Sequence, residues 1–282
     1  MMKYCFDYAE LAVKYLKTGK EEYLHKIAET GGAAHIFAHS KTYTTGNDAP
    51  ANALEMITPL IKSIAKEQEI LPFFERNLNY AKKLAASGEA EQTVLEYLPE
   101  DFAFENSTLF FTFGYDIGVG FGTNCSLNLA ATSALAGYKD NIHNIKMWAI
   151  HEMHHAGFMA LGGDEPPFMG QTRGELLPFI EFCTHLEGMA TYAAKSDPAP
   201  TQEEISEFFE IYKHFKTKPN EPMTEFDYEK YNDLSWRKRL FYKLGGHMAK
   251  LIDESCGRAV LTALIAQPSS DFIELGRTLC KS

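Results

Sequence analysis

The stretch Ile150-His151-Glu152-Met153-His154-His155-Ala156 decides how the rest of the chain is interpreted. On a helix, His151 and His155 stand one turn apart on the same face, where two imidazoles can bind one metal ion. Glu152 lies beside them and can accept a proton. The stretch therefore predicts a zinc-binding helix that supports hydrolysis, with Glu152 as the base. His154 is expected to be a neighbour of the metal site, because it does not share the face of the other two histidines.

The surrounding residues support a buried helix. The apolar pattern predicts a helix over residues 141–159, which ends before Gly162-Gly163 and two prolines. Residues 148–150 and 156–158 carry no charge, as a helix behind a metal site requires. The alternative is an exposed helix face with coincidental spacing, but chance would place His-Glu-x-x-His in only about 0.03 of such chains.

A third protein ligand is needed, because a catalytic zinc usually has three. Glu187 is the candidate in the next predicted helix, residues 172–195, where apolar neighbours leave its carboxylate in need of a partner. Gly188 follows it and is small enough to let two helices approach closely. The alternative is a solvated glutamate on an amphipathic helix.

Three other polar residues of this helix have expected roles near the site or in the packing. Glu181 and His185 compete with Glu187 for the ligand role, but His185 points about 200° away from Glu187 and is expected to be structural. Thr191 lies one turn after Glu187 and is expected to hydrogen-bond next to the metal.

The two motifs, His151-Glu152-x-x-His155 and Glu187-Gly188-Met189-Ala190, resemble those of the gluzincin group of zinc metallopeptidases. With an aromatic strand, a Gly-rich turn and a late Tyr-x-x-Gly, the chain also resembles an uncharacterised family described as zinc-dependent peptidases. The resemblance implies a zincin-like core, zinc as cofactor and a peptide or protein substrate. Thr191 stands where thermolysin-like enzymes carry an acidic residue, the gap before Glu187 is longer, and the Gly-x-Met-Glu-Asn segment of related aminopeptidases is absent.

The expected mechanism follows from these roles. Zinc would polarise the substrate carbonyl and lower the pKa of its bound water toward about 7, and Glu152 would pass the proton of that water to the leaving amine. The resemblance implies a downstream Tyr or His as donor to the oxyanion, and Tyr242 and His247 are the two candidates, each with an ordinary packing role as the alternative. Gly245-Gly246 between them costs helix stability, about 1 kcal/mol per glycine, and suggests close approach of another backbone or of substrate.

The centre of the chain predicts strands. Residues 108–113 are β-branched and aromatic, and a second strand is expected near residues 126–130. The resemblance implies that residues 108–113 form the edge strand that aligns an extended peptide; the alternative is a strand inside the sheet. The glycines of residues 118–122 lack the Lys-Ser/Thr of a phosphate loop. His35 and His39 have no nearby carboxylate and are expected to be a helix face, not a second metal site.

The overall expectation is an α+β, predominantly helical chain. It has an N-terminal helical region (residues 1–100), a zincin-like metal-binding core (101–196) and a C-terminal helical region (197–282) that together form one catalytic unit. Helices outside the two motif helices are expected at residues 51–68, 72–86, 89–98, 202–215, 234–255, 258–266 and 271–279.

Composition excludes several classes of protein. The net charge of −11 and the lack of a dense Lys/Arg block argue against a nucleic-acid partner. Asp7 and Glu10 interrupt the first apolar run, and no apolar span of transmembrane length follows, so neither a signal peptide nor a membrane partner is expected. Five scattered cysteines suit a reduced cytoplasm with buried free thiols. Oligomeric state is not readable.

Two alternatives to a peptidase stay open. Glu152-x-x-His155 and Glu22-x-x-His25 are each the Glu-x-x-His unit of di-iron carboxylate helical proteins, although two bridging glutamates would also be needed. A non-catalytic zincin-like domain could instead bind peptides without cutting them, but Glu152 would then have no role.

Overall fold

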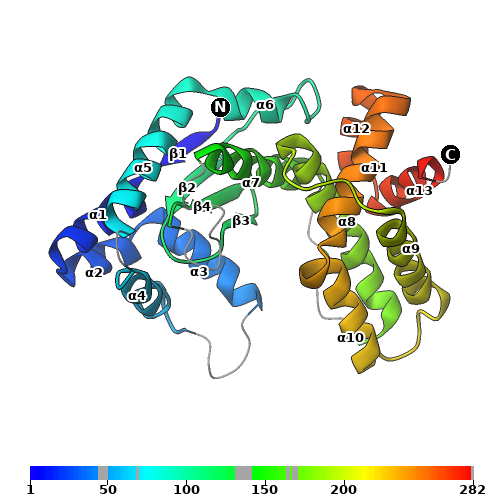
Figure 1. Cartoon of the computed structure of the whole chain (residues 1–282), viewed down its shortest axis with the longest axis horizontal. Coiled ribbons are helices and arrows are strands. Elements are labelled where there is room, and N and C mark those ends of the chain that lie inside the picture. The colour runs from blue at the N-terminus through cyan, green and yellow to red at the C-terminus, as the bar shows by residue number, and fades with distance from the viewer. Residues whose placement is uncertain (44–49, 68–69, 131–141, 163–165, 167–170, 281–282) are drawn as a thin grey trace. The chain divides into compact units, whose positions relative to one another are not determined.

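The structure is a computed structural model that describes residues 1–282 except 44–49, 68–69, 131–141, 163–165, 167–170 and 281–282 (Figure 1). Helices dominate, and one four-stranded sheet accompanies them, so the expected α+β, predominantly helical class is confirmed. The chain divides into two compact units, one of Met1–Val94 with Ala103–Ala156 and one of Leu95–Phe102 with Gly157–Ser282. Below they are called the sheet unit and the helical unit.

The sheet unit holds the four strands and the helices before them. Its elements are β1 (Lys3–Cys5), α1 (Asp7–Thr18), α2 (Glu22–Ala28), α3 (Gly31–Tyr43), α4 (Ala53–Ile64), α5 (Ile70–Ser87), α6 (Glu89–Leu95), β2 (Thr108–Thr112), β3 (Gly118–Phe121), β4 (Asn124–Asn128) and most of α7 (Ile142–Gly162). The strand order is β1-β2-β4-β3, with β1, β2 and β4 parallel and β3 antiparallel to β4.

This order corrects three expectations. β2 is not an edge strand, because it lies between β1 and β4. β3 falls in the segment that was expected to be a turn, and β1 falls where a helix was expected to begin. Both are short edge strands. Pairing with the neighbouring strand stabilises their extended conformation more than the β-propensity of their residues does.

The two faces of the sheet are covered by different helices. Phe110, Ser126 and Val119 are neighbours across β2, β4 and β3, so their side chains share a face. α3 covers that face, because a Cβ at Gly31 would lie 2.9 Å from the Phe110 ring. Gly118 and Gly120 alternate with Val119 and therefore face the other side, where α7 lies.

The helical unit is built around α8 (Arg173–Ala194) and α11 (Leu240–Cys256). Its other elements are the C-terminal turn of α7, α9 (Gln202–Thr217), α10 (Glu225–Asn232), η2 (Asp233–Arg237), α12 (Arg258–Ala263), η3 (Leu264–Ala266) and α13 (Ser269–Leu279). Thr172, Thr201 and Thr224 each form a capping box, which fixes where α8, α9 and α10 begin.

Two boundaries in this unit differ from expectation. α10 was not predicted, because only eight polar and aromatic residues form it and their apolar periodicity is weak. The helix expected from residue 234 begins at Leu240, because Arg239 has the left-handed backbone conformation, φ 55° and ψ 41°, and separates η2 from α11. Among the described helices, none is long and apolar enough to span a membrane.

Candidate metal centre

The first half of the candidate site lies on α7 in the sheet unit. His151, Glu152 and His155 are all buried, with 2%, 5% and 6% of their surfaces exposed. The rings of His151 and His155 have centroids 4.5 Å apart and planes at 84°. The indole of Trp148 packs edge-on against His151 with centroids 6.0 Å apart. α7 therefore presents two adjacent imidazoles from one buried face, and His154 is buried on the same helix.

β3 provides a floor without side chains beneath this face. A Cβ added at Gly118 would overlap the carboxylate of Glu152, and one added at Gly120 would lie 2.8 Å from the Cβ of His155. Two residues apart on a strand, these glycines point to the same side. Their missing side chains leave the space that Glu152 and His155 occupy, so the Gly-x-Gly of β3 and the motif of α7 fit one another.

Backbone groups of β3 point to the side away from β4. The amide of Asn128 donates to the carbonyl of Ile117 over 2.9 Å, which makes this a hydrogen-bonded pair of the antiparallel ladder. Because bonded and non-bonded pairs alternate, Gly118 and Gly120 are non-bonded positions whose N–H and C=O groups point away from β4. Among the described residues, no strand pairs with this edge.

Cys125 of β4 lies behind Glu152. Burial raises the pKa of the Cys125 thiol well above its ordinary value, and the charge of Glu152 raises it further. Both effects favour the neutral thiol over the thiolate. No disulfide joins the five cysteines, all of which are described; Cys125 is buried and Cys256 is exposed, so the expected burial of the thiols holds only in part.

Glu187 lies in the helical unit on α8 and is half-buried. The residue after it, Gly188, touches Gly245 of α11: a Cβ at Gly188 would lie 2.5 Å from the Gly245 Cα. The expected close approach of another backbone at Gly245-Gly246 is therefore confirmed, and the backbone is that of α8. Thr191 packs its methyl group against Gly246, and its buried hydroxyl makes none of the expected hydrogen bonds with described residues.

The two donor candidates lie on different sides of α11. The Arg239 guanidinium stacks over the Tyr242 ring, 4.0 Å from its centroid. Burial alone would lower the pKa of Arg239, but a hydrogen bond to Asp197 and the charges of Asp197, Tyr242 and Glu187 raise it. Tyr242 and Glu187 thus share one electrostatic neighbour. The pKa of His247 is lowered by burial and by Lys250 of its own helix, with Glu254 opposing.

The two competitors of Glu187 have other partners in the helical unit. Tyr212 donates a hydrogen bond to Glu181, whose pKa is raised by burial. His185 is stacked on Phe272 with centroids 4.3 Å apart, and its Nδ1 lies 3.2 Å from the Ser269 hydroxyl. Its packing and its Nδ1 contact fit the expected structural role, although its buried Nε2 has no hydrogen-bond partner among the described residues.

The second pair of histidines supports β3. His35 Nε2 lies 3.2 Å from the carbonyl oxygen of Val119, and His39 Nδ1 lies 3.2 Å from the Tyr115 hydroxyl. Both rings also pack against Phe121. They form a helix face, as expected. Glu22 and His25, the other Glu-x-x-His unit, are exposed on α2 and do not project inward as di-iron ligands do.

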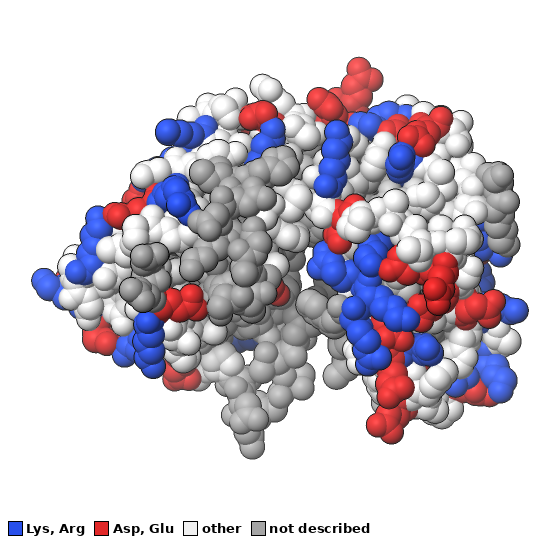
Figure 2. All heavy atoms as spheres, in the orientation of Figure 1, with Lys and Arg blue, Asp and Glu red and all other residues white. Residues whose placement is uncertain are grey.

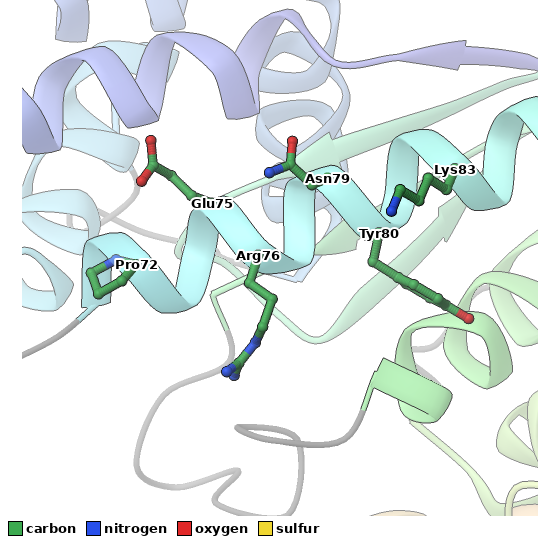
Figure 3. A pocket seen from close by; sticks show the side chains of 6 residues that line it. All are labelled: Pro72, Glu75, Arg76, Asn79, Tyr80 and Lys83. Atoms are coloured by element: carbon green, nitrogen blue, oxygen red, sulfur yellow. The ribbon is translucent and has the colours of Figure 1, made fainter.

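The described surface also carries a hollow outside the metal centre. A hollow of about 460 Å³ lies along α5 (Figure 3), but its lining comes from one helix and offers no metal-ligand set: Pro72, Glu75, Arg76, Asn79, Tyr80 and Lys83. On the face shown in Figure 2, basic and acidic side chains are interspersed.

Sequence reasoning missed two features of the site. Gly118–Phe121 alternates, with two glycines on one side and two apolar residues on the other. This alternation indicates a strand, whereas the glycines alone predict a turn. Arg239 carries no motif, and only its backbone conformation and its contacts identify it.

Comparison with known proteins supports the metal chemistry. No curated protein and no solved structure matches the chain. The family described as "Putative zinc dependent peptidase (DUF5700)" matches residues 38–282, which include both motifs and the donor candidates. The chain therefore belongs to this zinc-dependent peptidase family.

Proposed function

We propose that the chain is a gluzincin-type peptidase, in which His151, His155 and Glu187 hold one zinc ion and Glu152 is the general base. These ligands offer two imidazole nitrogens and one carboxylate oxygen, the donor set of a catalytic zinc. The observation that carries the proposal is the glycine floor: Gly118 leaves room for the carboxylate of Glu152 beside two buried imidazoles.

The environment of Glu187 supports its role as third ligand. It follows α7 on the next helix, and its backbone is fixed by the contact between Gly188 and Gly245. The carboxylate is half-buried, and its charge raises the pKa of Arg239. A carboxylate oxygen in such a place can bind zinc as the third protein ligand.

Zinc, when bound, lowers the pKa of water toward about 7 and polarises a carbonyl oxygen. Glu152 accepts the proton of the attacking water and returns it to the leaving amine. The open N–H and C=O groups of Gly118 and Gly120 bind the main chain of an extended peptide by strand addition, so β3 takes the aligning role first expected of β2. Tyr242 or His247 donates to the substrate oxygen that gains charge.

The proposed substrate is a peptide or a protein segment in extended conformation, with neither nucleic acid nor a membrane as partner. Free cysteines suit a reducing compartment, and we place the protein in the cytoplasm.

Metal analysis of the purified protein tests the ligand set. One zinc per chain is expected in the wild type, and His151→Ala and Glu187→Ala should lose it. His39→Ala is the matched control, because His39 also belongs to a pair one turn apart but lies against Tyr115. Undiminished zinc in both ligand variants would overturn the assignment.

A further inference from the structure

Arg239 occupies a strained position at the start of α11. Its φ of 55° is in the left-handed region, which costs a non-glycine residue on the order of 1 kcal/mol. The other described non-glycine residues with positive φ are Asn106, whose type tolerates it, and Lys195, which ends α8 in the usual left-handed cap. Arg239 lies directly after the cap residue of η2 and directly before α11, to which it gives no side-chain cap. Such strain persists where surrounding contacts over-determine it.

Those contacts hold the Arg239 side chain on two sides. Its Nε and Nη2 donate to the two carboxylate oxygens of Asp197 over 3.3 and 3.0 Å, a bidentate arrangement. Asp197 is 11% exposed and follows the C-terminal end of α8. The plane of the guanidinium covers the Tyr242 ring one turn along α11. Arg239 therefore connects the end of α8 to the ring of Tyr242.

The contacts of Arg239 are a second attachment between α8 and α11, in addition to the contact between their glycines. Gly188 and Gly245 fix the separation of α8 and α11 next to Glu187. The Asp197–Arg239 pair fixes the start of α11 relative to the end of α8. Tyr242 lies between these two points of attachment, whereas His247 lies beyond Gly245 and makes no hydrogen bond with described residues.

We propose that Arg239, held by Asp197, is a positioning residue that fixes the ring of Tyr242, and that Tyr242 is therefore the donor to the substrate oxygen. This rests on the proposed peptidase function for its catalytic consequence. The orientation of the ring itself does not depend on zinc or on activity, so the two claims can be tested apart.

The orientation is tested with 3-fluorotyrosine at position 242. A ring that flips slowly gives one ¹⁹F resonance for each of the two orientations of its fluorine that is populated, and a ring that flips fast gives one averaged resonance. Two resonances are expected in the wild type, and they should merge in Arg239→Gln and in Asp197→Asn. Arg258→Gln is the matched control, because the Arg258 guanidinium also stacks on a tyrosine, 3.9 Å from the centroid of the Tyr97 ring, and its Nε and Nη2 donate to one carboxylate oxygen of Asp253. It should leave the two resonances unchanged.

The catalytic consequence is tested by kinetics on the zinc-loaded protein. Arg239→Gln and Asp197→Asn should lower kcat on the order of tenfold with little change in KM or zinc content. In a Tyr242→Phe background they should cause no further loss, because the residue that they position is already gone.

The outcomes separate the two claims. One averaged resonance in the wild type, an unchanged pair in Arg239→Gln, or merging in Arg258→Gln as well would overturn the positioning role. Losses of kcat that add to that of Tyr242→Phe would do the same. If the ¹⁹F result holds but the wild type cleaves no peptide, the peptidase proposal fails and the positioning role stands.

Discussion

Gly188 of α8 and Gly245 of α11 are in direct backbone contact: a Cβ at Gly245 would lie 2.7 Å from the Cα of Gly188. This contact sits one residue after Glu187, so it determines where that carboxylate is placed within the helical unit. No side chain larger than hydrogen fits at either position without moving a backbone. The candidate ligand thus lies next to a tightly constrained point of α8.

Gly245→Ala should cost about 3 kcal/mol of unfolding free energy, because backbone must move to admit the methyl group. Gly246→Ala is the matched control on the next residue, where the added Cβ would meet the Thr191 methyl at 3.0 Å and the gain in helix propensity offsets part of the strain. Its change should stay within about 1 kcal/mol. Urea unfolding of the two variants makes the comparison. Equal losses of unfolding free energy in the two variants would show that α8 and α11 are not in close backbone contact at Gly245.

Substitution of the two glycines of β3 should impair different properties of the protein. Gly118→Ala displaces the Glu152 carboxylate, so kcat should fall about 100-fold while zinc is retained. Gly120→Ala presses on the Cβ of the proposed ligand His155, so zinc affinity should fall about tenfold. Zinc titration and initial rates distinguish the two. Loss of zinc in Gly118→Ala with no loss in Gly120→Ala would contradict the assignment of Gly118 to the space of Glu152 and of Gly120 to the space of His155.

Trp148 should report metal binding directly, because its indole packs against His151. The chain has two tryptophans, so Trp236→Phe leaves Trp148 as the only indole. Zinc added to the metal-free variant should change the emission with saturation at one equivalent, and His151→Ala should abolish the change. A response that survives in His151→Ala would place the metal elsewhere.

His185 should make the fold sensitive to mild acid. Burial lowers the pKa of its imidazole to about 3, whereas the imidazole of the unfolded chain is protonated near its ordinary pKa of 6.5. The unfolded state therefore binds the proton first, so stability is complete above about pH 6.5 and falls by about 1.4 kcal/mol per pH unit below it. His185→Phe should remove this dependence while keeping the stack on Phe272.

The measurement is urea unfolding of the metal-free protein at pH 7 and pH 5. His185→Phe should lose about 2 kcal/mol less than the wild type between these pH values. His25→Gln is the control at an exposed histidine and should follow the wild type. If His185→Phe loses as much as the wild type, the imidazole is protonated in the folded state.

How much the sequence could predict depends on how local each signal is. Helices α7 and α8 were predicted within a few residues, because strong stop signals follow α7 and a Thr-Glu capping box starts α8. The position of β2 inside the sheet was not predictable, because β1 comes from residues about 100 positions earlier and strand order is a long-range property. Its sequence, apolar on both faces, was a hint that both sides are covered.

In the site, too, local features could be predicted from the sequence and long-range ones could not. His151 and His155 are four residues apart, so their shared face follows from helix geometry, and Glu152 lies beside that face. Gly118 and Gly120 are placed beneath them by the pairing of β3 with β4, which the alternation in Gly118–Phe121 signals only weakly. Arg239 depends on Asp197, 42 positions away, and on a backbone angle that no residue pattern encodes.

The most direct test of the central claim is the turnover of a mixed peptide library by the zinc-loaded wild type and by Glu152→Gln. The variant keeps the size of the side chain and removes its basicity. We predict cleavage by the wild type, and a loss of kcat of about 100-fold or more in Glu152→Gln with one zinc per chain in both. Equal behaviour of the two proteins toward the library, with zinc retained in both, would contradict the account and identify a domain that binds peptides without cutting them.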